Sequence, residues 1–165
     1  MSKQSFLQIA QALNQANVRY IVVGGYAVIA HGHLRYTRDI DLVIRLEEAN
    51  LKRAFEALMS IGYNMRVPIT PQEFAHTETR EELIREKNMV VLNLWSDQHP
   101  TLPVDIFIRE PFDFEEEYRC ALQEEMPTGT KVRFARVPTL IKMKEGTGRA
   151  KDLDDLEFLR QFEST

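Results

Sequence analysis

The apolar residues of the chain recur at two spacings, one typical of helices and the other typical of strands. Apolar positions three and four residues apart predict helices over four segments. These are Ser5 to Ala16, Glu47 to Ile61, Pro138 to about Glu145, and the final segment from Lys151 to Phe162. Ser5 is the expected N-cap of the first helix. In the final segment, three leucines and Phe162 are expected to form one buried face, with the charged residues opposite.

Apolar runs and alternating patterns predict strands over six segments. These are Tyr20 to Val23, Asp39 to Arg45, Met89 to Trp95, Leu102 to Ile108, Arg119 to Glu125 and Thr130 to Val137. The third and fourth are joined by a polar turn, and the last two flank the sequence MPTG, so adjacent or antiparallel pairing is expected in both cases. A short helix, Tyr26 to His31, follows the first strand. Within Ile69 to Lys87, Thr70-Pro71 is suited to open a helix.

The second predicted strand contains two carboxylates, Asp39 and Asp41. Alternate residues of a strand share a face, so the two side chains should lie about 7 Å apart on one side. Ionised carboxylates are costly to bury, so this face must meet water, cations or a metal. Oxygen ligands of this kind suit Mg²⁺ or Mn²⁺ better than zinc. Asp105, in the fourth strand, completes a two-metal cluster if that strand lies beside the second. The alternative is an edge strand with a solvated acidic face.

Gly24-Gly25 lies where a strand passes into a helix. Glycines at such a junction let backbone N–H groups approach a phosphate closely. The sequence has no G-x-G-x-x-G and no G-K-[ST], so it supports neither a Rossmann dinucleotide site nor a P-loop. The informative combination is therefore a glycine turn, a short helix and then D-x-D.

Composition and charge limit the number of domains, the cellular compartment and the class of ligand that the sequence supports. The 165 residues fit one domain, and a single cysteine, Cys120, excludes an internal disulfide and favours a reducing, cytoplasmic compartment. No apolar run approaches the roughly 20 residues of a membrane span, so no membrane role is expected. The net charge is −4, yet residues 128–151 contain seven basic residues and one acidic residue. That stretch suits a triphosphate or an RNA end, although a solvated charged face is the simpler reading of charge alone.

The stretch VVGGYAVIAHGHLRYTRDIDLVI resembles the polymerase-beta-type nucleotidyltransferase superfamily. Within it, the chain is most similar to the minimal bacterial AbiEii-like branch, which includes toxins of toxin-antitoxin systems and is related to antibiotic nucleotidyltransferases. The resemblance implies the following roles. Gly24 and Gly25 would contact the nucleotide phosphates, Asp39, Asp41 and Asp105 would be catalytic metal ligands, and Arg35 and Thr37 would support the site.

The sequence LIKMKEGTGRAKDLDDLEFL resembles the closing segment of that branch. The resemblance implies that Lys144 meets the triphosphate and that Arg149, Lys151 and Asp152 lie near the nucleotide. Lys142 competes with Lys144 for this role, because the two point in different directions on a helix.

Other residues with chemical potential have simpler interpretations. His31 and His33 are expected to be loop histidines rather than zinc ligands. His76 and His99 are expected at the surface, and Cys120 is expected to be structural. The aromatic group of Trp95, Phe107, Phe112 and Phe114 is expected in the core or at its edge.

We therefore expect an α/β (α+β) fold with a mixed, mainly antiparallel sheet and flanking helices. Residues 1–137 would form the catalytic core, and residues 138–165 a C-terminal helical segment that closes over the site within one compact domain. The enzyme would transfer a nucleoside monophosphate from an NTP, with Mg²⁺ or Mn²⁺, to an acceptor hydroxyl. The acceptor would be an RNA end such as tRNA, a protein, or a small molecule such as an antibiotic, and an antitoxin would be a partner. The alternative is a catalytically idle nucleotide-binding module that acts through a partner protein.

Overall fold

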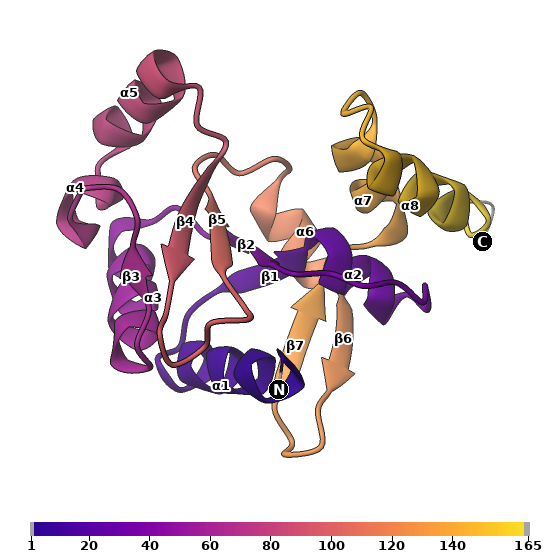
Figure 1. Ribbon diagram of the computed structural model, residues 1–165, viewed down its shortest axis with the longest axis horizontal. Coiled ribbons are helices and arrows are strands. Elements are labelled where there is room, and N and C mark those ends of the chain that lie inside the picture. The colour runs from indigo at the N-terminus through magenta and orange to yellow at the C-terminus, as the bar shows by residue number, and fades with distance from the viewer. Residues whose placement is uncertain (1, 164–165) are drawn as a thin grey trace.

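The computed structural model describes residues 2–163, which form one twisted sheet of seven strands with helices around it (Figure 1). The strands are β1 (Tyr20–Val23), β2 (Ile40–Ile44), β3 (Asn64–Met65), β4 (Val91–Trp95), β5 (Val104–Phe107), β6 (Leu122–Glu125) and β7 (Lys131–Phe134). Their order across the sheet is β3-β4-β5-β2-β1-β7-β6. The pairs β1–β7 and β2–β5 are parallel and the other four are antiparallel. The predicted mixed, mainly antiparallel sheet is confirmed.

The helices are α1 (Ser2–Gln15), α2 (Gly24–Ala30), α3 (Glu48–Ser60), α4 (Pro71–Ala75), α5 (Thr77–Lys87), α6 (Phe114–Cys120), α7 (Val137–Lys144) and α8 (Ala150–Arg160). In Figure 1, α7 and α8 lie together at one end of the molecule, and α3, α4 and α5 lie at the other. None of the helices within residues 2–163 combines the length and the apolar character that a bilayer crossing requires.

The predicted start of the first helix is wrong, whereas the helix start predicted at Thr70-Pro71 is confirmed. Helix α1 begins before Ser5, which is not its N-cap, because the Ser5 hydroxyl lies inside the helix and hydrogen-bonds the His99 imidazole at 2.9 Å. His99 is accordingly buried and not at the surface as expected. The segment after Ile69 forms two helices. The first is opened by a capping box between Thr70 and Glu73.

Helix α6 replaces the first part of a predicted strand. The Asp113 carboxylate accepts a hydrogen bond from the Glu116 backbone N–H at 3.1 Å, which caps the helix. The helix then holds Phe114 and Glu117 against the core and ends at Cys120, so the strand starts only at Leu122. The hairpin β6–β7 itself is confirmed. Cys120 is exposed, which places it outside the core.

The buried face of α8 differs from the predicted one. Leu156 and Leu159 are buried as expected, but Leu153 is 57% exposed and Phe162 is 39% exposed. Asp152 and Asp155 are buried instead. Hydrophobic periodicity could not reveal this, because the aspartates are neutralised by basic residues that lie outside the pattern of the helix: Arg149 and Lys144, which precede α8, and Arg35, 120 residues before Asp155. One of the two buried aspartates of α8, Asp152, lines the candidate site.

Candidate active site

Three carboxylates are brought together by the register of the central strands. Asp41 of β2 lies beside Asp105 of β5 in a parallel pair, and Asp39 immediately precedes β2. On its other side Asp41 lies opposite Val23, the last residue before the glycine turn. The sequence motifs are thus adjacent in space because β2 lies between β1 and β5.

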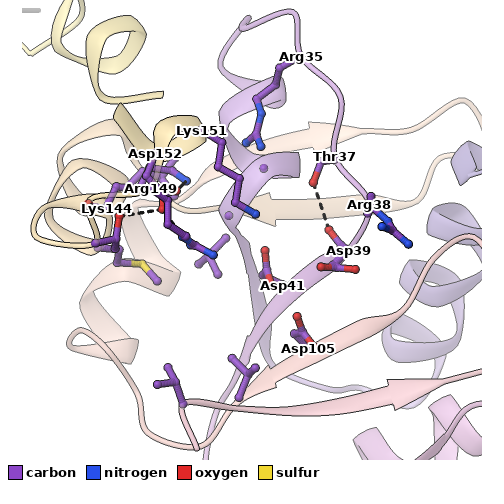
Figure 2. Close-up of a pocket in the computed structure, with 18 of the residues that line it drawn as sticks. Arg35, Thr37, Arg38, Asp39, Asp41, Asp105, Lys144, Arg149, Lys151 and Asp152 are labelled. Atoms are coloured by element: carbon purple, nitrogen blue, oxygen red, sulfur yellow. Dashed lines mark hydrogen bonds and ion pairs between the residues drawn. The ribbon is translucent and has the colours of Figure 1, made fainter. Parts of the chain in front are cut away.

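The carboxylates face a cavity of about 620 Å³ that also receives the basic C-terminal residues (Figure 2). Every residue that the sequence proposed for the site lines this cavity. They are Gly24, Gly25, Arg35, Thr37, Asp39, Asp41, Asp105, Lys144, Arg149, Lys151 and Asp152. The volume falls within the roughly 300–1,000 Å³ range typical of small-molecule sites. Tyr36, Arg38 and Thr147 also line it, and sequence patterns gave no reason to select them.

Crowding of the carboxylates changes their acidity. Burial, with the neighbouring charges of Asp105 and Asp39, raises the pKa of Asp41 to about 7. Burial also raises the pKa of Asp105, against the effect of a hydrogen bond from Asn93. Because burial and mutual repulsion disfavour the ionised carboxylates, a cation bound between them would stabilise the cluster. Its donors are all carboxylate oxygens, which fits a hard divalent ion such as Mg²⁺ or Mn²⁺.

The glycine turn is packed against this cluster. Gly24 has φ +68°, and a Cβ there would collide with the Asp41 carboxylate. A Cβ on Gly25 would collide with the Thr37 hydroxyl and approach the Arg35 guanidinium. Both positions therefore exclude a side chain, which keeps the backbone open to the cavity.

The basic side of the cavity is ordered by the buried aspartates of α8. Lys144 Nζ lies 3.1 Å from Asp152 Oδ1 and 2.8 Å from Asp155 Oδ2. Arg35 Nη1 donates to the same Asp155 oxygen at 2.9 Å. Although burial opposes its ionisation, hydrogen bonds from Thr147, Arg149 and Lys144 hold the pKa of Asp152 at about 2. The C-terminal helices are thus joined by ion pairs to the loop that precedes β2.

Lys142 and Lys144 occupy different surroundings. Lys144 is buried at the cavity, whereas Lys142 is exposed and lines a neighbouring groove. Among the lysines of α7, Lys144 is therefore the one at the candidate site.

Asn93 is a polar residue that sequence reasoning missed. It lies opposite Asp105 in the β4–β5 pair, and its amide donates to Asp105 Oδ1 at 2.6 Å. The Arg66 guanidinium in turn donates to the Asn93 side-chain oxygen. These contacts fix the orientation of the Asp105 carboxylate. The signal available in the sequence was a single asparagine within an apolar strand.

The histidines lie apart from the carboxylate cluster. His31 hydrogen-bonds the Ala135 carbonyl at 2.8 Å. His33 Nε2 lies 2.9 Å from Asp154 Oδ2, and with Asp155 these residues bring three ligand atoms within 4.8 Å of one another. Since Asp155 already pairs with Arg35 and Lys144, we interpret this group as part of the ion-pair network.

Known structures share the fold. The lincosamide antibiotic adenylyltransferase LnuA, lincomycin-bound, is 16% identical, with 97% of this chain and 96% of that chain covered and a TM-score of 0.60. The antibiotic-resistance factor ANT(2'')-Ia is 14% identical, with 96% and 84% covered and a TM-score of 0.60. JHP933 from Helicobacter pylori is 17% identical, with 96% and 64% covered and a TM-score of 0.54. At 14–17% identity, the similarity to these three structures establishes the fold of this chain and nothing more. No curated protein matches the chain.

The sequence match establishes the family. The family model described as aminoglycoside-2''-adenylyltransferase matches residues 5–118, which include the glycine turn and all three carboxylates. The resemblance to nucleotidyltransferases of the polymerase-beta type is confirmed at the level of the superfamily, and the prediction of an enzyme is confirmed as well. The chain belongs to the aminoglycoside-2''-adenylyltransferase family and is a nucleotidyltransferase.

Proposed function

We propose that the chain transfers a nucleoside monophosphate from an NTP to a hydroxyl of a small molecule, in a reaction that depends on a divalent metal. The observation that carries this proposal is the register of β2 and β5. It brings Asp39, Asp41 and Asp105 into one cavity with basic residues of α7 and α8. Carboxylates for metal and cations for phosphate are the two requirements of nucleotidyl transfer.

The three aspartates fit a divalent metal. Asp39, Asp41 and Asp105 would hold Mg²⁺ or Mn²⁺, because their oxygens are the preferred donors and their mutual repulsion would be relieved. When bound, the metal supplies positive charge that polarises the phosphate oxygens and stabilises the charge that develops during transfer.

The opposite wall of the cavity would hold the triphosphate. Gly24 and Gly25 present open backbone, and Arg149 and Lys151 present exposed cationic groups. The Lys151 side chain extends toward the carboxylates in Figure 2, and its charge acts on Asp41. Lys144 would contribute from a position fixed by Asp152 and Asp155. In this proposal, residues 138–163 supply cations to a catalytic core formed by residues 2–137, and the remainder of the two predicted segments, residues 1 and 164–165, lies outside the described residues.

Asp105 would act on the acceptor. The acceptor hydroxyl oxygen attacks the α-phosphorus, the bond to pyrophosphate breaks, and the Asp105 carboxylate accepts the hydroxyl proton. The hydrogen bond from Asn93 to Asp105 Oδ1 would orient the carboxylate for this task. Arg35 and Thr37 would support the site through contacts to Asp155 and the Asp39 backbone carbonyl.

The family and two structural relatives favour a small-molecule acceptor. Those relatives are described as acting on, or conferring resistance to, antibiotics. Three of the seven basic residues of 128–151 line the cavity, which suits a triphosphate better than an RNA footprint. Membership of the AbiEii-like branch, an RNA or protein acceptor, an antitoxin partner and a cytoplasmic location stay predictions from the sequence.

A titration combined with a transfer assay tests the proposal. Calorimetric titration with each NTP, with and without Mg²⁺, measures binding, and α-labelled NTP measures transfer to a mixture of small molecules, RNA and protein. We expect metal-dependent binding and label in the small-molecule fraction, both abolished by Asp39→Asn. Tight binding with no transfer to any fraction would instead establish the idle nucleotide-binding module.

A further inference from the structure

A histidine and two aspartates from distant parts of the chain meet outside the active-site cavity. His33 lies in the loop between α2 and β2, and Asp154 and Asp155 lie in α8. One ligand atom from each of these residues falls within 4.8 Å of the other two. The residues that line the active-site cavity do not include any of the three. The group is therefore separate from the carboxylates proposed for catalysis.

The ion pairs of Asp155 leave one of its oxygens unpartnered. The residue is fully buried, and Arg35 and Lys144 both approach its Oδ2, at 2.9 and 2.8 Å. Oδ1 has no hydrogen-bond partner among residues 2–163. His33 Nε2 lies 3.8 Å from Oδ1, which is too far for a hydrogen bond. Because buried polar atoms almost always have a partner, this oxygen indicates a ligand position on the side that faces His33.

The His33 ring is fixed near both carboxylates but can donate to only one of them. Its Nε2 lies 2.9 Å from Asp154 Oδ2, and a ring nitrogen carries at most one proton. The ring also stacks on Phe158, with the ring centroids 4.5 Å apart. A metal ion bound to Nε2 would take the place of that proton, which would pass to solvent. Unlike the proton, the ion would contact both aspartates.

The spacing of the ligand atoms suits a small transition-metal ion. Ligands about 2.1 Å from a tetrahedral Zn²⁺ lie about 3.4 Å from one another. The distances from His33 Nε2, 2.9 Å to Asp154 Oδ2 and 3.8 Å to Asp155 Oδ1, lie on either side of this value. One imidazole nitrogen with two carboxylates favours Zn²⁺, Co²⁺ or Ni²⁺ over Mg²⁺, which prefers oxygen ligands alone. The Asp154 side chain is 64% exposed, so water can reach the ion and complete its coordination.

The cations beside Asp155 have two opposite effects on such a site. Arg35 and Lys144 hold the carboxylate through Oδ2, and outer contacts of this kind orient a metal ligand. Their positive charges also oppose the binding of a divalent ion. With three protein ligands and this repulsion, we expect a dissociation constant on the order of 10 µM for Zn²⁺.

We propose that His33, Asp154 and Asp155 form a binding site for a transition-metal ion of the Zn²⁺ class. The ion would join the loop before β2 to α8 and so hold the C-terminal helices on the core. No spacing rule predicts the site, because His33 and Asp154 are 121 residues apart in the sequence. The inference is independent of the proposed function, since both the ligands and the preferred metal differ from those of the catalytic carboxylates.

NMR signals of the histidine ring nitrogens test the site directly. The catalytic carboxylates have no histidine beside them among the described residues that line their cavity, so the His33 signals distinguish the two metal sites. The full chain, labelled with ¹⁵N and kept in excess Mg²⁺, is titrated with Zn²⁺, and His33→Ala assigns the signals. We expect Zn²⁺ to shift the His33 signals with a dissociation constant on the order of 10 µM, and Mg²⁺ to leave them unchanged. Asp154→Asn should weaken Zn²⁺ binding at least about tenfold.

Thermal unfolding in excess Mg²⁺ gives a second readout. A Zn²⁺ concentration about 100-fold above the dissociation constant should raise the unfolding midpoint of the wild type by about 5 °C, and that of Asp154→Asn by less than half as much. His76→Ala, at an exposed position between α4 and α5, is the matched control and should respond to Zn²⁺ as the wild type does. His33 signals that do not respond to Zn²⁺, or equal Zn²⁺ affinities of the wild type and Asp154→Asn, would overturn the proposal. Neither result would affect the proposed function, which is measured separately as nucleotidyl transfer in Mg²⁺.

Discussion

Replacing Asp41 by asparagine removes a carboxylate whose ionisation opposes folding. Burial and the charges of Asp105 and Asp39 raise its pKa from 3.8 to about 7. Between these values the folded chain retains a proton that the unfolded chain releases. The folded state therefore binds more protons, and stability decreases as the pH rises from about 4 to about 7.

The size of the effect follows from the shift in pKa. A difference of roughly three units corresponds to about 4 kcal/mol at 1.36 kcal/mol per unit. Asp41 opens to a cavity, so solvent screening reduces this figure. We expect the stability advantage of Asp41→Asn over the wild type to grow by about 2 kcal/mol between pH 5 and pH 8, and to level off at higher pH.

Urea denaturation in EDTA at pH 5, 6, 7 and 8 measures this difference. Asp97→Asn, at an exposed loop position, is the matched control, and its difference from the wild type should stay within about 0.5 kcal/mol at every pH. Added Mg²⁺ at pH 8 should stabilise the wild type and not the Asp41→Asn variant. A stability difference for Asp41→Asn that is constant from pH 5 to pH 8, or that favours the wild type at pH 8, would refute the assigned electrostatics.

Three further substitutions test individual contacts. Asn93→Ala should lower kcat by about tenfold or more with little change in the KM for NTP, because it frees the Asp105 carboxylate to rotate; steady-state kinetics measures this, and an unchanged kcat would count against the contact. Asp155→Asn should lower the free energy of unfolding by about 3 kcal/mol, since Lys144 and Arg35 lose a buried partner; Asp154→Asn on the exposed side of α8 is the control, and equal losses in both would contradict the reasoning. Gly24→Ala should cost about 1–3 kcal/mol in urea denaturation and abolish transfer, because alanine is strained at the positive φ of this position and its Cβ would collide with the Asp41 carboxylate; wild-type stability would show that the turn adapts.

Sequence patterns predicted the parts of the site that depend on local order. The β2 carboxylates, the glycine turn and Asp105 lie within strands and turns whose apolar patterns are strong, so their faces followed from periodicity. Their convergence needed only the expectation that β5 lies beside β2, which the register confirms.

The features that the sequence patterns did not predict depend mostly on contacts between segments that are distant in the sequence. The burial of Asp155 is possible because Arg35 approaches from the loop before β2, 120 residues away in sequence, and no local pattern encodes such pairing. The burial of His99 likewise depends on Ser5, which is 94 residues away, so the sequence around His99 does not indicate it. The two-residue strand β3 has too few residues for an alternating pattern to stand out.

The most direct test of the central claim is nucleotidyl transfer by Asp41→Asn at pH 8, under conditions where the variant is at least as stable as the wild type. The amounts of pyrophosphate and of nucleotidylated acceptor are measured together for both proteins, in Mg²⁺ and in EDTA. The metal site proposed at Asp39, Asp41 and Asp105 predicts equal amounts of the two products from the wild type in Mg²⁺ and neither from the folded variant. Transfer by Asp41→Asn at the wild-type rate, or transfer by the wild type in EDTA, would contradict it.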